Sequence, residues 1–393
     1  MESLGRDISS EMARDMLAFF SERKDDFLVN TRMLVELESP SGDETGSRAV
    51  VNLLVEIARD INGVGSVERI QRPQYGEHLV VRAFTENKNT HGTLVLVGHT
   101  DTVHERGSLE KSPWRHEGNR IHAPGIFDMK ANCVLALEAL RACSILSLSP
   151  QREVVLVLTC DEETGSETGR SLIESNARDA SYALVLEPPA SGGRVKTGRK
   201  GTGIFTLEID GCAAHAGLEP EKGASAILEM ARQIERLHAM NNSDGGINVN
   251  VGVVSGGTRS NVVAAYSSAE IDLRFSSIEA GRRVEDQILE LKPIDERTRV
   301  RVGGGINRPP LERTENVLEL YNHAKRIASG LGFELDEAQV GGGSDGNFIA
   351  ALGVPVLDGL GLDGDGAHAA HEHIIKDDIE RRGALLTGLI ASL

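Results

Sequence analysis

The residues best suited to chemistry in this sequence are imidazoles and carboxylates that follow apolar segments. His99 and Asp101 come directly after the apolar segment 93–97. In an extended segment these two side chains point to the same side, because side chains alternate with a period of two. A carboxylate beside an imidazole orients the ring and raises its basicity, a common arrangement at metal ligands. The alternative is a surface turn.

Further carboxylates follow the same pattern. Asp128 opens the helix-like segment 131–140, where by itself it fits a helix N-cap better than a ligand. Asp161-Glu162-Glu163 ends the apolar segment 153–160, and three adjacent carboxylates are costly to desolvate without cations. A solvated loop is the alternative there. Glu187 closes the apolar segment 183–186.

The C-terminal segment 366–373 is dense in histidine, which is typical of a metal-binding loop and also of a polar surface. Together, these motifs predict a dinuclear metal site. Two zinc ions bring four positive charges, three carboxylates remove three, and a bridging hydroxide removes the last. Histidine and carboxylate ligands suit zinc, with manganese or cobalt as substitutes. The predicted ligands are His99, Asp128, Glu163, Glu187 and His368.

The elements that position these residues alternate between strand and helix. The chain has 393 residues, too many for one ordinary core, so two domains are expected. Short apolar strands separated by helices indicate an α/β layer whose parallel or mixed sheet is covered on both faces. We expect helices at 10–37, 47–62, 132–143 and 315–331, and strands at 78–84, 92–99, 153–160 and 181–188.

From about residue 201 the pattern of apolar and polar residues changes. Strand-like segments in which apolar and polar residues alternate now appear with helical segments, as is typical of an α+β module. The order β-α-β-β-α-β fits a ferredoxin-like fold. We therefore expect a catalytic domain at 1–199 and 308–393, interrupted by an inserted domain at 200–307. The module's strands are predicted at 203–211, 246–257, 261–275 and 298–303, and its helices at 224–240 and 278–292.

Composition excludes several classes of partner. A net charge of −17 repels phosphate backbones and anionic lipid, so neither nucleic acid nor membrane is expected as a partner. No apolar run reaches the roughly 18–20 residues that span a bilayer. The N-terminus lacks a signal-peptide pattern, and the four cysteines lack CxxC pairing, which favours reduced thiols in a cytoplasmic protein.

The glycine runs allow one binding role. GRKGTGIF leads into a strand and no GxxxxGK[ST] element is present, so a nucleotide-dependent transferase is excluded. GGGSDG precedes a helix, and backbone amides around Gly343 could hold a substrate carboxylate. A tight turn is the alternative.

The order HTDTV, PGIFDMK, DEETGS, LEP, CAAHAG, SNVV, DLRF, GGGSDGNF and GAHAAHE resembles the zinc aminoacylase/carboxypeptidase family. That family includes acetylornithine deacetylase, succinyl-diaminopimelate desuccinylase and a folate-cleaving glutamate carboxypeptidase. The resemblance runs from about residue 25 to the end. It is nearest to the glutamate carboxypeptidase branch, through PGIFDMK, LEPP and the GGGSD to GAH stretch.

This resemblance implies roles for the residues. One zinc would be bound by His99, Asp128 and Glu187, and the other by Asp128, Glu163 and His368, with Asp128 bridging. His371 stands where the family has Asn or Asp, so His371 and His373 stay open as ligands; we favour His368 for its Gly-Ala approach. His104, His116 and His122 are expected to be structural or surface groups.

The resemblance further implies that Asp101 orients His99 and that Glu162 is the general base. His215 would reach the active site of a partner subunit in a homodimer formed through the inserted domain. Asn261 and Arg274 would bind the substrate carboxylate.

We therefore expect hydrolysis of an N-acyl amino acid or dipeptide-like amide with a free C-terminal carboxylate, glutamate favoured. An aminoacylase or deacetylase acting on another amino acid is the close alternative. From another class, a metal-loaded non-catalytic binding protein is disfavoured, because such a site needs no Glu162 beside Glu163.

Overall fold

A computed structural model describes residues 5–87 and 92–393. Contacts divide the chain into two compact units, each with its own hydrophobic core. The first unit comprises the residues up to Gly198 together with Arg313–Val340 and Ser344–Leu393. The second comprises Arg199–Glu312 and Gly341–Gly343. The first division, at 198/199, is next to the predicted domain boundary at 199/200. The second, at 312/313, comes later in the chain than the predicted boundary at 307/308.

The first unit contains a six-stranded mixed sheet. Its β1 and β2 are antiparallel, as are β2 and β6, whereas β3 is parallel to both β6 and β7. All of β6 is buried, as expected for a strand covered on both faces. The strand order is β1 (Val64–Arg72), β2 (Gly76–Ala83), β6 (Glu153–Thr159), β3 (Thr93–His99), β7 (Ala180–Val185) and β14 (Val356–Leu357).

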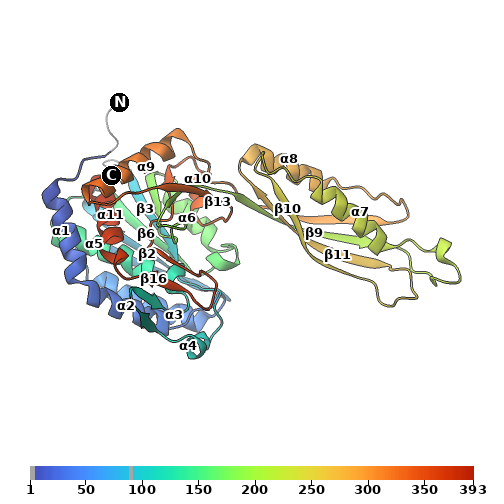
Figure 1. Ribbon diagram of the computed structural model, residues 1–393, viewed down its shortest axis with the longest axis horizontal. Coiled ribbons are helices and arrows are strands. Elements are labelled where there is room, and N and C mark those ends of the chain that lie inside the picture. The colour runs from blue at the N-terminus through green and yellow to red at the C-terminus, as the bar shows by residue number, and fades with distance from the viewer. Residues whose placement is uncertain (1–4, 88–91) are drawn as a thin grey trace. The chain divides into compact units, whose positions relative to one another are not determined.

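Helices flank this sheet (Figure 1), and the predicted α/β architecture is confirmed. The predicted helical region 10–37 forms two helices, α1 and α2, joined at Arg23. Helix α5 is buried along most of its length, which explains its apolar sequence. The helices are α1 (Ser10–Glu22), α2 (Lys24–Glu36), α3 (Glu44–Arg59), α4 (Ser108–Lys111), α5 (Ala131–Ile145), α6 (Gly169–Ala177), α9 (Glu315–Gly330), α10 (Gly346–Ala350) and α11 (Asp378–Ser392).

Short strands complete the first unit. A four-stranded sheet places the C-terminal histidine loop beside residues 115–122, because His373 pairs with His122 across it. Its order is β15 (Gly364–Asp365), β16 (His373–Ile375), β5 (Arg120–His122) and β4 (Arg115–Glu117), and separately β13 (Glu337–Val340) pairs with β8 (Val195–Arg199).

The second unit has the predicted ferredoxin-like order. Its four strands are antiparallel in the order β10-β11-β9-β12, and α7 and α8 pack on the sheet around the unit's core (Figure 1). Its elements are β9 (Gly201–Asp210), α7 (Ala226–His238), β10 (Asn248–Gly256), β11 (Tyr266–Phe275), α8 (Ile278–Leu289) and β12 (Arg299–Arg308).

Two strands differ from the sequence prediction. The strand predicted at 261–275 begins at Tyr266, because the residues before it pair with a loop: the Val263 N–H donates to the Ala214 carbonyl oxygen over 2.9 Å. Strand β1 was not predicted, since it lies at the sheet edge with mostly exposed or half-buried side chains. No helix in the described part of the chain is long and apolar enough to cross a membrane.

Candidate metal centre

His99 ends β3 with its ring almost completely buried. Its Nδ1 lies 3.0 Å from the backbone oxygen of Asp101 and 3.4 Å from Asp101 Oδ1. Its Nε2 lies 3.1 Å from Asp128 Oδ1 and 3.5 Å from Glu187 Oε1. Burial lowers the pKa of His99, but hydrogen bonds to these carboxylates outweigh it and raise the pKa well above its usual value. Because Nδ1–H donates to Asp101, Nε2 is the ring nitrogen that can bind a metal ion.

Asp101 is buried and connects His99 to the acidic turn at 162–164. Its carboxylate accepts hydrogen bonds from Ser41 Oγ at 2.7 Å and from the N–H groups of Glu162 and Glu163, each at 3.2 Å. This carboxylate therefore fixes both the imidazole and the backbone that carries the two glutamates.

Asp128 lies between two imidazoles. Its Oδ1 faces His99, and its Oδ2 lies 3.4 Å from His368 Nε2. Helix α5 begins only at Ala131 and has no side-chain N-cap, so the capping role considered for Asp128 is wrong. Burial opposes its charge, yet hydrogen bonds to His368 and His99 lower the pKa of Asp128. A carboxylate with one oxygen toward each histidine has the arrangement of a bridging ligand.

Glu163 lies beside His368, with Oε2 3.2 Å from His368 Nε2. Its Oε1 is buried and has no hydrogen-bond partner in the part of the chain that the structure describes. Burial raises the pKa of Glu163 to about 7; the charge on His99 opposes this and that on Asp128 adds to it. The hydrogen bond to Asp128 raises the pKa of His368 to about 9.

These residues fit a divalent-cation site. Ligand atoms of His99, Asp128 and Glu163 lie within 4.8 Å of one another, as do those of His99, Glu162 and Glu187. A bound cation would partner the unsatisfied oxygen of Glu163 and offset the repulsion among the carboxylates. Nitrogen and oxygen donors of this kind suit zinc.

The other two histidines of the C-terminal loop have different surroundings. His371 is exposed, and its carbonyl oxygen accepts hydrogen bonds from His122 Nδ1 at 3.1 Å and His373 Nδ1 at 3.0 Å. His368 is the one whose ring reaches Asp128 and Glu163. Its position next to these carboxylates supports the choice made from sequence.

Glu372 is a residue that sequence reasoning missed. Its buried carboxylate accepts hydrogen bonds from the N–H groups of Gly125, Phe127 and Asp128 and from His104 Nε2. These partners lie 244–268 positions away in the chain, so no local pattern announces them. Only the position of Glu372 within the histidine loop could have drawn attention to it.

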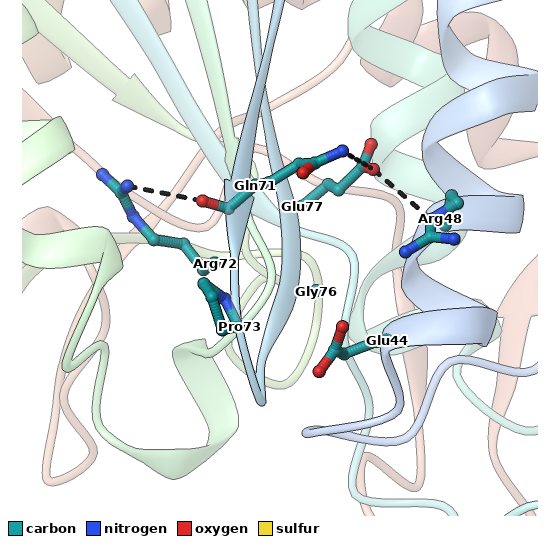
Figure 2. Close-up of a pocket in the computed structure, with 7 residues that line it drawn as sticks. All are labelled: Glu44, Arg48, Gln71, Arg72, Pro73, Gly76 and Glu77. Carbon is teal, nitrogen blue, oxygen red and sulfur yellow. Dashed lines mark hydrogen bonds and ion pairs between the residues drawn. The ribbon is translucent and has the colours of Figure 1, made fainter.

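Two pockets of the first unit differ in their relation to this centre. One, of about 170 Å³, lies beside His368 and is lined by His104, Ser108, Lys111, Ser112, Pro124, His368, Ala369 and Ala370. The other, of about 80 Å³, lies by α3 and the β1–β2 hairpin (Figure 2). In it, Glu77 interacts with Arg48 and Gln71, and none of the predicted site residues lines it.

The remaining predicted residues belong to the second unit. His215 is exposed, and its Nδ1 accepts a hydrogen bond from the Gly217 N–H at 3.1 Å. The neighbouring Ala216 N–H donates to the carbonyl oxygen of Asn261 at 3.0 Å. The structure therefore brings the loops of His215 and Asn261 together.

Arg274 and Gly343 also have partners within this unit. Arg274 forms a two-nitrogen ion pair with Asp272, with distances of 2.8 Å from both Nε and Nη2 to the carboxylate. The carbonyl oxygen of Gly343 accepts a hydrogen bond from Arg199 at 3.1 Å. A Cβ at Gly343 would lie 3.2 Å from Arg308 Cδ, so the turn is closely packed.

The fold and the site together define a metal-dependent amidohydrolase of the metallopeptidase type. The profile of "Peptidase family M20/M25/M40" matches residues 95–392. The chain belongs to this family. It is therefore a hydrolase that acts on peptides or acyl-amino acids.

Three similar proteins illustrate the family's range. Carboxypeptidase G2 of Pseudomonas sp. (strain RS-16) is 28% identical over 372 residues, covering 92% of this chain and 87% of that protein. Succinyl-diaminopimelate desuccinylase of Verminephrobacter eiseniae (strain EF01-2) is 29% identical over 320 residues, covering 76% and 78%. The crystal structure of aminopeptidase PepT from Bacillus cereus ATCC 10987 has a TM-score of 0.72 at 22% identity, covering 94% and 98%, and shares the fold.

Proposed function

We propose that this protein is a dinuclear zinc carboxypeptidase that releases a C-terminal acidic amino acid, glutamate first, from an N-acyl or peptide substrate. The observation that carries the proposal is the Asp128 carboxylate, whose two oxygens face His99 and His368 respectively. Glu187 completes the ligand set on the His99 side, and Glu163 on the His368 side. Two zinc ions held there would polarise the scissile carbonyl and lower the pKa of the attacking water.

Glu162 is the proposed general base. A carboxylate oxygen of Glu162 lies within 4.8 Å of His99 and Glu187, and its backbone is held by Asp101. In this position Glu162 takes a proton from the attacking water and passes it to the leaving nitrogen. Asp101 keeps the His99 ring oriented, because its backbone oxygen lies 3.0 Å from His99 Nδ1.

Substrate recognition is assigned to two groups of residues. In the second unit, Arg274, Asn261 and the amides around Gly343 bind the free carboxylate, since a guanidinium can hold a carboxylate through two hydrogen bonds. His215 of the partner subunit stabilises the oxyanion. In the first unit, the pocket beside His368 receives the acyl side of the substrate.

Carboxypeptidase activity is supported by the similarity to carboxypeptidase G2 over nearly the whole chain, and the preference for glutamate by the motifs shared with the glutamate carboxypeptidase branch. The second candidate is deacylation of another N-acyl amino acid, which the similarity to a succinyl-diaminopimelate desuccinylase favours. A panel of N-acyl amino acids and dipeptides assayed with zinc-loaded protein separates the two. A higher kcat/KM for any non-acidic amino acid than for glutamate would select the second.

The catalytic assignment is tested by Glu162→Gln. This change should lower kcat on the order of 10²-fold or more, as expected for loss of a general base, and leave about two zinc ions per chain by elemental analysis. Glu167→Gln is the matched control, because Glu167 is exposed in the same segment and pairs with Tyr75. Loss of metal in Glu162→Gln would show instead that Glu162 is a ligand.

A further inference from the structure

We propose that Glu372 is a positioning residue. It holds the two segments that carry Asp128 and His368 in the arrangement needed to bind the cation on the His368 side of the metal centre. This inference rests on the metal centre of the proposed function and adds a residue to it. Glu372 does not face the centre as a ligand, because its two carboxylate oxygens are already occupied by donors from the protein.

The hydrogen bonds of Glu372 join segments that are distant in sequence. Its Oε1 accepts from the Phe127 N–H at 2.8 Å and the Asp128 N–H at 3.0 Å. Its Oε2 accepts from the Gly125 N–H at 2.8 Å and from His104 Nε2 at 2.5 Å. The first three donors form the turn from which the Asp128 side chain projects, so one carboxylate fixes that turn.

The same residue belongs to the loop that carries His368. That loop is tightly folded: the Ala369 N–H donates to the Gly366 carbonyl oxygen at 2.8 Å, and the Glu372 N–H donates to the Ala369 carbonyl oxygen at 3.1 Å. His368 itself has a φ of 65°, in the left-handed region that non-glycine residues seldom occupy. A shift of Glu372 would therefore move the His368 backbone relative to Asp128.

Only a carboxylate meets the demands of this position. Four donors require two oxygens that both accept, and an ionised carboxylate is acceptor-only. A glutamine at 372 would keep one oxygen and direct an NH₂ group at two of the donors. Because Glu372 is only 2% exposed, water cannot readily take over the lost hydrogen bonds. Glu372→Gln should therefore disturb the site although it conserves size and shape.

The test is a zinc titration of the metal-free protein against a chromophoric chelator. In Glu372→Gln at least one of the two zinc affinities should fall on the order of 10–100-fold, the usual effect of losing a residue that orients metal ligands. Glu372→Asp should retain part of the affinity, because it preserves both acceptors. Glu105→Gln is the control, since Glu105 is exposed next to His104.

His104→Leu removes one donor, since leucine has no polar group, and changes no residue of the histidine loop; this variant serves if Glu372→Gln does not fold. It should lower the same zinc affinity by a smaller factor. Zinc affinities equal to wild type in a folded variant would overturn the role of Glu372. A wild-type capacity of one zinc would contradict the dinuclear site instead; the effect of each variant on that single affinity would still decide the inference about Glu372.

Discussion

Arg274 on β11 has two competing partners, the Asp272 carboxylate and the carboxylate of the proposed substrate. In the structure its guanidinium binds Asp272, two residues away on the same half-buried side of the strand. An ion pair at that level of exposure contributes at most about 1 kcal/mol, so it can yield to a substrate carboxylate. The ion pair with Asp272 is thus compatible with substrate binding, because the Arg274 guanidinium can exchange Asp272 for the substrate carboxylate.

We expect Arg274→Ala to lower kcat/KM for free-acid substrates. The loss should correspond to roughly 2–4 kcal/mol of transition-state stabilisation, because the substrate carboxylate loses its guanidinium partner. Discrimination between a substrate and its C-terminal amide should fall, and Arg274→Lys should recover only part of it. Steady-state kinetics with acid and amide pairs measures this. Asp272→Asn is the control that frees Arg274. An equal loss on acid and amide substrates would assign Arg274 to the fold.

Residue types predicted much of the site, but not its supporting hydrogen bonds. His99, Glu163 and Glu187 stand out because each follows an apolar segment, Asp128 because it precedes a helix-like one, and His368 because it lies in a histidine-dense loop. Glu372 lies in the same loop, but its role was not predicted, since its partners come from segments more than two hundred residues earlier. Nor could the sequence show that Asp128 leaves the capping of α5 unfilled, because that depends on where the helix begins.

At the scale of elements, the contact between α9 and α11 contains a buried histidine. His323 of α9 is fully buried, with Nε2 2.7 Å from the Ser392 hydroxyl at the end of α11. Burial, assisted by the charge of Arg326, lowers the pKa of His323 to about 4. The folded state therefore keeps this imidazole neutral in a pH range where an unfolded chain protonates it.

Stability should accordingly fall as the pH drops from about 6.5, the value for an unfolded histidine, to about 4. Each pH unit within that window costs about 1.4 kcal/mol from this residue. Urea unfolding at pH 7.5 and at pH 5 measures the effect. His323→Gln should lose about 2 kcal/mol less than wild type between these values. Equal losses would mean that His323 is not the titrating group.

Strongly patterned elements were predicted from the sequence, and weakly patterned ones were not. The apolar strands β3 and β6 and the β-α-β-β-α-β order follow from local periodicity. Strand β1 has few buried side chains, and the strands around His122 and His373 are only three residues long. Strand β1 forms through a hairpin with β2, and the strand at His373 forms by pairing with the distant strand at His122, so neither depends on a periodic pattern of buried side chains.

At the scale of the whole molecule, the proposed homodimer depends on the second unit. That unit has exposed apolar side chains, an arrangement that favours association. A symmetric pairing of two chains is common among enzymes and would let His215 act in the site of the partner. The exposed side chains are Ile204, Leu218, Ile227, Leu228, Val253, Val254, Tyr266, Leu289 and Ile294.

Mixing two inactive variants tests this assembly. His215→Ala and Glu162→Ala chains should together regain partial activity, because one composite site in each heterodimer has both intact groups. At most about a quarter of the sites in a statistical mixture would be complete. A monomer by light scattering, or no recovery after demonstrated exchange of subunits, would contradict the role in trans.

The cysteines provide a means to demonstrate that exchange. Cys133, Cys143 and Cys160 are buried, and burial raises the pKa of the Cys133 thiol to about 12 and those of the other two further still. Cys212 is exposed, three positions before His215. Because the thiolate is the reactive form, a maleimide dye should label the native protein at Cys212 without any engineered site. Energy transfer between donor-labelled and acceptor-labelled chains would then report the rate at which two populations mix.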